Sequence, residues 1–301
     1  MHNVTGRHLL LMGAGYTARA VALGFQAAGG TVSATLRDPD RASGLASLGL
    51  RPVLIDQDGH LPPSALSGVT DLLISAPPGS TGCPALASMA GAVSKTDVQW
   101  VGYYSSTAVY GDCGGAWIDE SRPPAPATAD AKARLVAEAA WLAETARLGA
   151  NLDIFRIAGI YGPEGRNVLS QLRNGKARAI LKAGQVFNRI HRDDIVGATL
   201  AAMAAPQPHR LTNLADGVPV PACDILIGVA EMLGLPRPPG VAFDSAGLPS
   251  GAVAFYAENR RISNQALRSL PGFELRYKDW QAGYRAIIAA EQRPVSASAA
   301  G

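Results

Sequence analysis

The chain has 301 residues, of which 48% are apolar and 17% charged, and its formal net charge is +3; this composition is typical of a globular protein. No apolar run reaches the about 20 residues that cross a bilayer, and the basic residues are scattered, so we expect neither a membrane nor a nucleic-acid partner. The three cysteines, Cys83, Cys113 and Cys223, match no zinc or disulfide spacing. We therefore expect no bound metal and a reducing, cytoplasmic location.

A strand, a glycine turn and a helix start follow one another near the N-terminus. The apolar run at residues 9–12 predicts a buried strand, and Gly13 after it allows a tight turn. Gly15 lets the backbone approach a pyrophosphate, and Ala18 keeps the helix close to the strand. The alternative is a turn that only packs the helix. We assign to a dinucleotide site Gly13, Gly15, Tyr16, Thr17 and Ala18.

The end of the next predicted strand, at residues 31–36, indicates which dinucleotide binds. Enzymes that use NAD usually have an acidic residue there for the ribose 2′-hydroxyl, whereas this strand ends at Leu36 and Arg37 follows. A guanidinium suits a 2′-phosphate, to which it donates two charge-assisted hydrogen bonds. Arg37 therefore favours NADP(H) over NAD(H). Asp38 keeps NAD(H) open as an alternative, because its carboxylate would bind ribose or pair with Arg37.

Strands alternate with helices through the first half of the chain. Further strands are predicted at 51–55, 71–75, 99–105 and 152–157, and helices near 85–93 and at 130–148. Such alternation gives right-handed crossovers and a parallel sheet covered on both faces. The expected fold class is α/β, a doubly wound parallel Rossmann sheet with a smaller C-terminal substrate lobe, and its ligands should bind at the carboxyl ends of the strands.

The alternation weakens after about residue 160, where prolines become dense and helices are predicted near 224–233 and 278–291. We therefore predict three parts. They are an NAD(P)-binding Rossmann domain over 1–160, to which part of 188–215 returns, a substrate-binding lobe over 161–292, and a disordered tail over 293–301.

Three further motifs lie downstream of the glycine turn. They read Tyr104-Ser-Ser-Thr-Ala-Val-Tyr-Gly, Phe155-Arg-Ile-Ala-Gly-Ile-Tyr-Gly-Pro and Asn188-Arg-Ile-His-Arg-Asp-Asp. In this order, the motifs resemble those of the extended short-chain dehydrogenase/reductase family, the sugar-nucleotide epimerases and dehydratases. The resemblance implies that Ser106 hydrogen-bonds the reacting oxygen of the substrate. It also implies further cofactor contacts at Asp56, Ala76, Pro77, Ala158, Gly159 and Ile160.

The chain departs from this family at the start of the long predicted helix. The family has Tyr-x-x-x-Lys-x-x-x-Glu there, and alignment on Glu138 places Asp130 at the tyrosine and Arg134 at the lysine. The family's tyrosine is its general acid/base. An aspartate, with an ordinary pKa of about 3.9, is already ionised at neutral pH, and arginine does not exchange a proton. Arg134 could still bind the nicotinamide ribose, or the two could simply form an ion pair on the helix.

If the protein is a catalyst, another group must move the proton, and Tyr110 is the nearest candidate to Ser106 in sequence. The catalytic candidates are therefore Ser106, Tyr110, Asp130 and Arg134. An aromatic ring suits a base or a sugar, and arginine suits an anionic group, although each could instead serve in packing or lie in solvent. The substrate candidates are Trp117, Tyr161, Arg189, His191 and Arg261.

The sequence thus predicts an NADP(H)-dependent oxidoreductase of the epimerase/dehydratase type, acting by hydride transfer on a small or nucleotide-linked substrate. The alternative is a non-catalytic NAD(P)-binding sensor that acts through a protein partner, which the missing tyrosine–lysine pair favours. The resemblance also implies a possible homodimer through the long helix 130–148.

Overall fold

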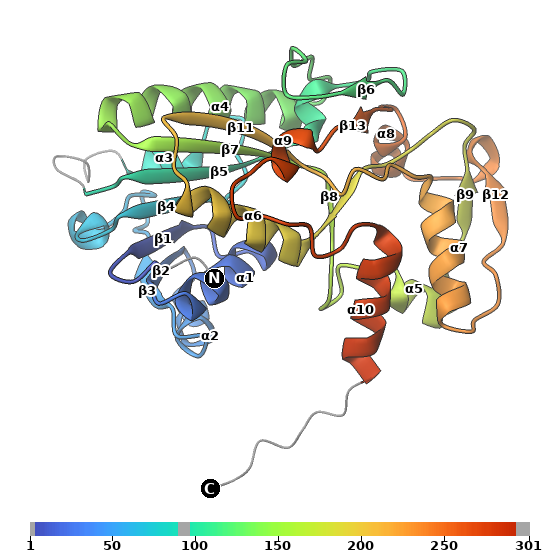
Figure 1. Ribbon diagram of the computed structural model, residues 1–301, viewed down its shortest axis with the longest axis horizontal. Coiled ribbons are helices and arrows are strands. Elements are labelled where there is room, and N and C mark those ends of the chain that lie inside the picture. The colour runs from blue at the N-terminus through green and yellow to red at the C-terminus, as the bar shows by residue number, and fades with distance from the viewer. Residues whose placement is uncertain (1–3, 90–96, 293–301) are drawn as a thin grey trace, which may run out of the picture.

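The computed structural model describes residues 4–89 and 97–292. A seven-stranded parallel sheet lies at its centre, in the order β11-β7-β5-β4-β1-β2-β3 (Figure 1). The strands are β1 (His8–Met12), β2 (Thr31–Leu36), β3 (Arg51–Leu54), β4 (Asp71–Ile74), β5 (Trp100–Ser106), β7 (Asn151–Ile157) and β11 (His209–Leu214). The predicted Rossmann sheet is confirmed, and six of its strands match the prediction to within one residue at each end. The sequence does not predict β11, because four of its six residues are polar.

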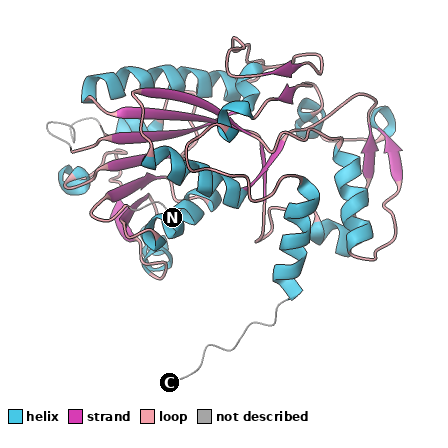
Figure 2. Ribbon diagram, viewed as in Figure 1, coloured by secondary structure: helices cyan, strands magenta, loops and turns pink. Residues whose placement is uncertain are grey.

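Helices cover both faces of this sheet (Figure 2). One face packs against α1 (Tyr16–Ala27) and α6 (Arg192–Ala204), with α2 (Ala42–Ala46) at its edge. The other face packs against α3 (Pro84–Ser88) and α4 (Ala129–Leu148). The strand order reverses between β1 and β4, which is the place where an open parallel sheet forms its ligand crevice.

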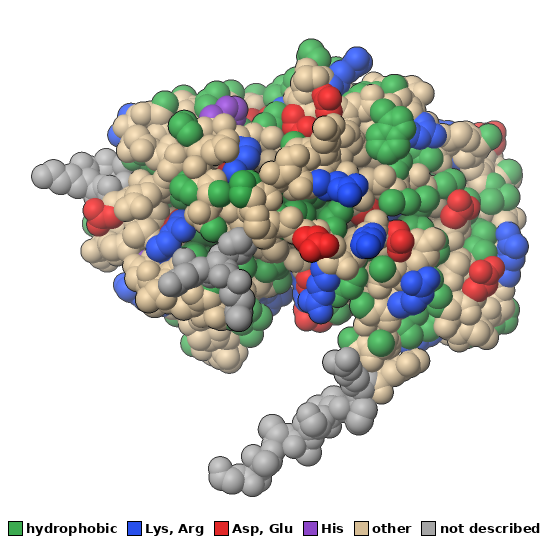
Figure 3. Space-filling view, viewed as in Figure 1, with side chains coloured by type: hydrophobic (Ala, Val, Ile, Leu, Met, Phe, Trp, Pro, Cys, Tyr) green, Lys and Arg blue, Asp and Glu red, His purple; other side chains and the backbone are tan. Residues whose placement is uncertain are grey.

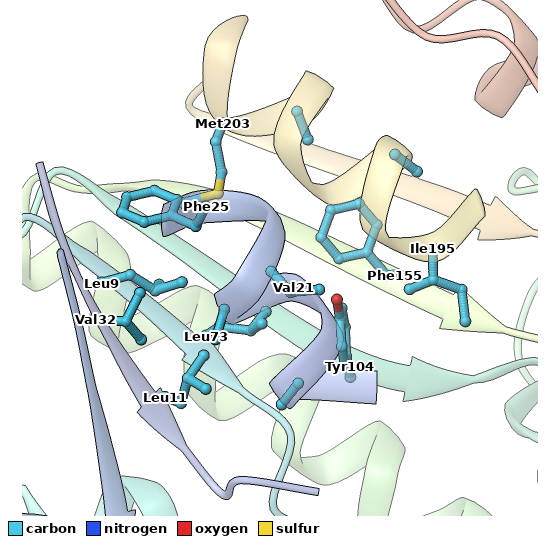
Figure 4. Close-up of a cluster of buried hydrophobic side chains, with 14 of the residues drawn as sticks. Leu9, Leu11, Val21, Phe25, Val32, Leu73, Tyr104, Phe155, Ile195 and Met203 are labelled. Atoms are coloured by element: carbon cyan, nitrogen blue, oxygen red, sulfur yellow. The ribbon is translucent and has the colours of Figure 1, made fainter. Parts of the chain in front are cut away.

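Strand β1 shows why its sequence is a continuous apolar run. Leu9 and Leu11 point to the face that carries α1, where Val21 and Phe25 pack against them (Figure 4). Leu10 and Met12 belong to the core on the opposite face. Because side chains alternate along a strand and both faces are buried, every position must be apolar.

The second half of the chain builds a smaller lobe with its own core. It contains α5 (Leu169–Arg173), α7 (Ala222–Met232) and α10 (Trp280–Gln292), and β9 (Ala179–Leu181) paired with β12 (Gly240–Ala242). The helices α7 and α10 are those predicted near 224–233 and 278–291.

Short parallel strand pairs lie between the sheet and this lobe. They are β8 (Gly159–Tyr161) with β10 (Arg189–His191), and β6 (Trp117–Ile118) with β13 (Arg261–Ile262). The remaining helices are α8 (Ser250–Phe255) and α9 (Gln265–Arg268).

Two predictions fall partly or wholly outside the described residues. The helix expected near 85–93 is α3 over Pro84–Ser88, followed by a turn at Met89, and the rest of the expected range lies outside the described residues, as does the tail predicted at 293–301. Within residues 4–89 and 97–292, no helix has the length and apolarity needed to cross a bilayer. On the face shown in Figure 3, basic and acidic side chains are interspersed.

Candidate functional site

A cavity of about 790 Å³ lies at the carboxyl ends of β1, β2 and β4. Its wall includes the glycine turn, the end of β2 and the loop after β4. The predicted cofactor residues that line it are Gly13, Gly15, Arg37, Ala76 and Pro77. The fold therefore brings together, around one space, residues that are up to 64 positions apart in the sequence.

Gly13 and Gly15 differ in how the surrounding structure would accept a side chain. Gly13 has φ +97°, and a Cβ there would lie 2.7 Å from the backbone nitrogen of Ala76; a side chain at this position would be both strained and blocked. Gly15 has φ −76°, which any residue adopts, and a Cβ there would meet no protein atom within 4 Å. The fold thus requires a glycine at position 13, whereas a Cβ at position 15 would enter space that no protein atom fills.

The N-terminus of α1 is left available to an anion. No side chain caps it and its first turn has no acidic residue, whereas the side chains of Thr128 and His191 cap α4 and α6. Free amides and the partial positive charge of the helix therefore face outward. This arrangement fits a pyrophosphate.

The three remaining residues predicted in this turn do not line the cavity. The side chains of Thr17 and Ala18 are buried against the sheet. The Tyr16 hydroxyl donates to the Pro163 carbonyl at 2.7 Å, and its ring lies 5.0 Å from the Arg192 guanidinium carbon. The Tyr16 side chain therefore connects α1 to the loop after β8 and does not point into the cavity.

Two arginines that the sequence analysis missed share the cavity with Arg37. They are Arg19, one turn into α1, and Arg41, in the 3-10 turn after β2. In the described part of the chain, none of these three arginines forms an ion pair. The Asp38 carboxylate instead accepts the Asp40 amide at 3.0 Å, so its predicted pairing with Arg37 is not formed.

Asp56 lies beside this cavity without lining it. Its carboxylate accepts the His60 amide at 2.7 Å and so closes its own loop. The neighbouring Ile55 and Gly59 form the wall there. The contact of Asp56 with adenine stays a prediction.

A second cavity, of about 340 Å³, lies where the sheet meets the smaller lobe. It brings together the predicted residues Ser106, Ala158 and Gly159, whereas Ile160 does not line it. The Ser106 Oγ accepts the Ala108 amide at 3.1 Å, which leaves its O–H free to donate. This placement fits the predicted hydrogen bond from Ser106 to a substrate oxygen.

The placement of Tyr110 gives no support to the prediction that it moves a proton. Its side chain is fully buried, its hydroxyl donates to Asn213 Oδ1 at 2.8 Å, and burial raises its pKa. Tyr110 does not line the cavity beside Ser106. The Val-Tyr-Gly sequence is thus needed for the core beneath the site.

Asp130 and Arg134 do not form the ion pair that was the alternative to a role at the site. Arg134 Nη1 donates to the Tyr104 carbonyl on β5 at 3.2 Å, and Asp130 is exposed in the first turn of α4. Neither lines the second cavity. Asp130 therefore has no contact there that would support proton transfer.

A buried ion pair beneath the site was not predicted. Arg156 on β7 donates to Glu138 on α4 through Nε at 3.1 Å and Nη2 at 2.7 Å, and Glu138 Oε1 also accepts the Ser105 hydroxyl at 2.5 Å. The Arg156 guanidinium lies 4.7 Å from the centre of the Tyr110 ring. Because Ser105 directly precedes Ser106, this pair fixes the end of β5.

Two of the predicted substrate residues lie in the core of the smaller lobe. Tyr161 is 4% exposed and stacks on Tyr284 at 5.2 Å. His191 is 2% exposed, its Nδ1 accepts the Asp193 amide at 3.1 Å, and burial lowers its pKa to about 4. Both pack against neighbouring side chains, so their assignment to the substrate stays a prediction without support from their placement.

The other three substrate candidates also lie outside the wall of the second cavity. Trp117 is 58% exposed and lines a separate hollow of about 480 Å³. Arg261 donates to the Gly115 carbonyl. Arg189 Nη1 donates to the Phe187 carbonyl at 3.4 Å.

Asp216 makes stability depend on pH. It is 5% exposed, its Oδ1 accepts the Val218 amide at 2.9 Å, and its Oδ2 has no hydrogen-bond partner among the described residues. Burial raises its pKa to about 7, although the Arg189 charge acts in the opposite direction.

We expect Asp216→Asn to raise the melting temperature at pH 8 and to have a smaller effect at pH 5. The folded protein holds the Asp216 proton up to about pH 7, whereas the unfolded chain loses it near pH 4. The native state therefore binds more protons between these values, and stability falls as pH rises through that window. Melting curves of both proteins from pH 4 to pH 8 measure this, and an equal shift at every pH would contradict it.

The comparisons with solved structures define the class of fold. UDP-glucuronic acid 4-epimerase from Bacillus cereus, solved with NAD, has a TM-score of 0.71 at 13% identity and covers 95% of this chain and 100% of its own. A short-chain dehydrogenase/reductase superfamily protein from Agrobacterium tumefaciens, with bound NAD, has a TM-score of 0.70 at 17% identity, with 95% and 97% covered. The fold is the Rossmann-like fold of the epimerases and short-chain dehydrogenases.

A more similar structure identifies the family. It is described as a functionally unknown conserved protein from Silicibacter pomeroyi, and it is 41% identical with a TM-score of 0.87 over 94% of this chain and 99% of that chain. The chain belongs to the family of this protein. No protein-family model matches the sequence, and no curated protein does.

Proposed function

We propose that the protein is an NADP(H)-dependent oxidoreductase of the epimerase/dehydratase superfamily. The observation that carries this proposal is the continuity of the glycine turn, the uncapped start of α1 and the unpaired Arg37 around one cavity. The two structural neighbours that were solved with NAD support a nicotinamide cofactor in this fold.

The described residues fit each part of such a cofactor. The amides at the start of α1 would bind the pyrophosphate, and Ala76 and Pro77 would border the adenosine ribose. Arg19, Arg37 and Arg41 would bind a 2′-phosphate, since unpaired guanidiniums bind phosphate with charge-assisted hydrogen bonds. NADPH, when bound, supplies a hydride to a carbonyl carbon.

We expect Arg37→Ala to weaken NADPH binding by roughly 10- to 100-fold, the loss that a hydrogen bond between charged groups of about 1.5–3 kcal/mol implies. NADH lacks the 2′-phosphate, so its affinity should change by less than about threefold. The enhanced fluorescence of the bound reduced nucleotide measures both. Arg51→Ala, a substitution of an exposed arginine outside the cavity wall, is the control. Equal losses for the two nucleotides would contradict the 2′-phosphate assignment.

The role proposed for Ser106 is to donate its free O–H to the reacting oxygen of the substrate. The balanced reaction is reduction of a carbonyl: its carbon would take the hydride, its oxygen would take a proton from water, and an alcohol, NADP⁺ and hydroxide would result. No tyrosine is needed if the cavity admits water as the proton source.

We expect Ser106→Ala to lower kcat by roughly 100-fold, because a positioned donor to a developing oxyanion contributes on this order, and to leave NADPH affinity unchanged. Tyr110→Phe should keep kcat within about twofold and should lower the free energy of unfolding by about 1 kcal/mol, since it loses only the bond to Asn213. Steady-state kinetics and urea unfolding test the pair. Full activity of Ser106→Ala would contradict this assignment, whereas a wild-type protein that binds NADPH and reduces no substrate would favour the alternative, a non-catalytic NAD(P)-binding sensor.

We also propose that a second copy of the chain covers the outer face of α4. Val136 and Leu142 on this helix are 63% and 43% exposed, which is costly for large apolar side chains in water. A light-scattering mass equal to one chain would contradict this homodimer.

A further inference from the structure

The second cavity is unusual in having no free positive charge. Arg260 is the one lysine or arginine among the described residues that line it. Its Nη1 donates to the Gly111 carbonyl and to Glu258 Oε2, both at 2.6 Å. The guanidinium is therefore neutralised and held in place by the protein itself.

Two further cations outside the cavity wall donate to backbone carbonyls. Lys182 donates to the Tyr256 carbonyl, and Arg261 donates to the Gly115 carbonyl. A diphosphate or a carboxylate needs unpaired donors that carry positive charge. The charge of Arg260 is already offset by Glu258, and Lys182 and Arg261 lie outside the cavity wall.

Glu258 has a side-chain oxygen that accepts no hydrogen bond from the described residues. Its side chain is 13% exposed and its residue lines the cavity. Its Oε1 is buried and has no hydrogen-bond partner among the described residues, while Oε2 is held by Arg260. A buried carboxylate oxygen without a partner is costly, and a donor from a ligand would satisfy it.

The rest of the wall is neutral. Phe187 and Phe255 stack at 4.6 Å and form its apolar side. Both polar atoms of the Asn188 amide are engaged, one with the Arg260 carbonyl and one with the Ile262 amide. The side-chain groups left for a ligand include the hydroxyl donors of Ser106 and Thr128 and the acceptor Glu258 Oε1.

We propose that the substrate is a small, uncharged hydroxy-aldehyde or hydroxy-ketone, with its carbonyl oxygen on Ser106 and a hydroxyl donated to Glu258 Oε1. This inference rests on the proposed oxidoreductase function. Glu258 then determines specificity, because its pairing with Arg260 leaves no net positive charge at this place for a phosphate or carboxylate. UDP-glucuronic acid and UDP-glucose, the ligands of one structural neighbour, are nucleoside diphosphate sugars, and the proposal predicts that this class is not turned over.

The test compares D-glyceraldehyde with D-glyceraldehyde 3-phosphate, which differ by one phosphate, as substrates for NADPH oxidation. We expect kcat/KM to be at least tenfold higher for the uncharged compound. Glu258→Gln keeps an oxygen for Arg260 and removes the charge, so it should reduce this ratio at least fivefold. Glu144→Gln, on the outer side of α4, is the matched control and should leave the ratio unchanged.

A binding measurement without turnover accompanies it. Calorimetric titration of UDP into the protein saturated with NADP⁺ should give no binding heat at millimolar UDP. UDP binding, preference for the phosphorylated aldehyde, no reduction of either aldehyde, or an unchanged ratio in Glu258→Gln would each overturn the substrate assignment. The same samples report NADPH affinity, so failure of the oxidoreductase proposal would be seen separately as failure to bind NADPH.

Discussion

Gly15→Ala is expected to weaken NADPH binding at least tenfold, about 1.4 kcal/mol, while leaving the melting temperature within about 1–2 °C of the wild type. The added Cβ would contact no protein atom within 4 Å, and φ −76° suits alanine, so the fold has no reason to change. The methyl group would occupy the space through which a pyrophosphate approaches the start of α1. Nucleotide fluorescence titration and a melting curve on the same sample give both quantities.

Gly13→Ala is the matched control for this substitution. There the new Cβ would lie 2.7 Å from the Ala76 nitrogen at φ +97°, so folding itself should suffer. A variant at Gly15 that binds NADPH as tightly as the wild type would contradict the placement of the pyrophosphate. A Gly15 variant that is as destabilised as the Gly13 variant would show that the turn serves the fold alone.

Arg156→Met is expected to lower the free energy of unfolding by about 3–5 kcal/mol, the cost of leaving a buried charge without its partner. Glu138 would keep its carboxylate at 5% exposure, with the Ser105 hydroxyl as its remaining side-chain donor. Urea unfolding at neutral pH measures the change.

Two comparisons make this result specific. Arg173→Met breaks an ion pair whose side chains are 48% and 38% exposed, and it should not shift the urea midpoint measurably, because exposed pairs contribute little. The double variant Arg156→Met with Glu138→Leu should be more stable than Arg156→Met alone, since it removes the unpaired charge. If the single and double variants were equally destabilised, loss of packing and not the buried charge would be the cause.

The sheet could be predicted because the residues within each strand are enough to indicate that the strand is buried. Residues 9–12 and 71–74 are buried on both faces, so each strand is a continuous apolar run that the sequence displays directly. Strand β11 at residues 209–214 escaped prediction because it lies at the edge of the sheet and pairs only with β7, so half of its residues remain partly or fully exposed.

The candidate site could be predicted only where its residues directly follow, in the sequence, the strands that position them. The glycine turn and Arg37 are adjacent to the strands that position them. By contrast, Tyr110 is only four residues from Ser106 in the chain, yet its side chain lies in the core, because the 3-10 turn after β5 directs its hydroxyl to Asn213. Glu258 reaches the cavity from 152 positions beyond Ser106, and no sequence pattern marks it.

The central claim, that the first cavity binds NADP(H), is tested most directly by calorimetric titration of the purified protein with NADPH and with NADH, after carried-over nucleotide has been removed. The account predicts one NADPH per chain, bound at least tenfold more tightly than NADH because Arg19, Arg37 and Arg41 are unpaired around the cavity. Tighter binding of NADH would contradict the 2′-phosphate site. Binding of neither nucleotide would contradict the oxidoreductase function as a whole.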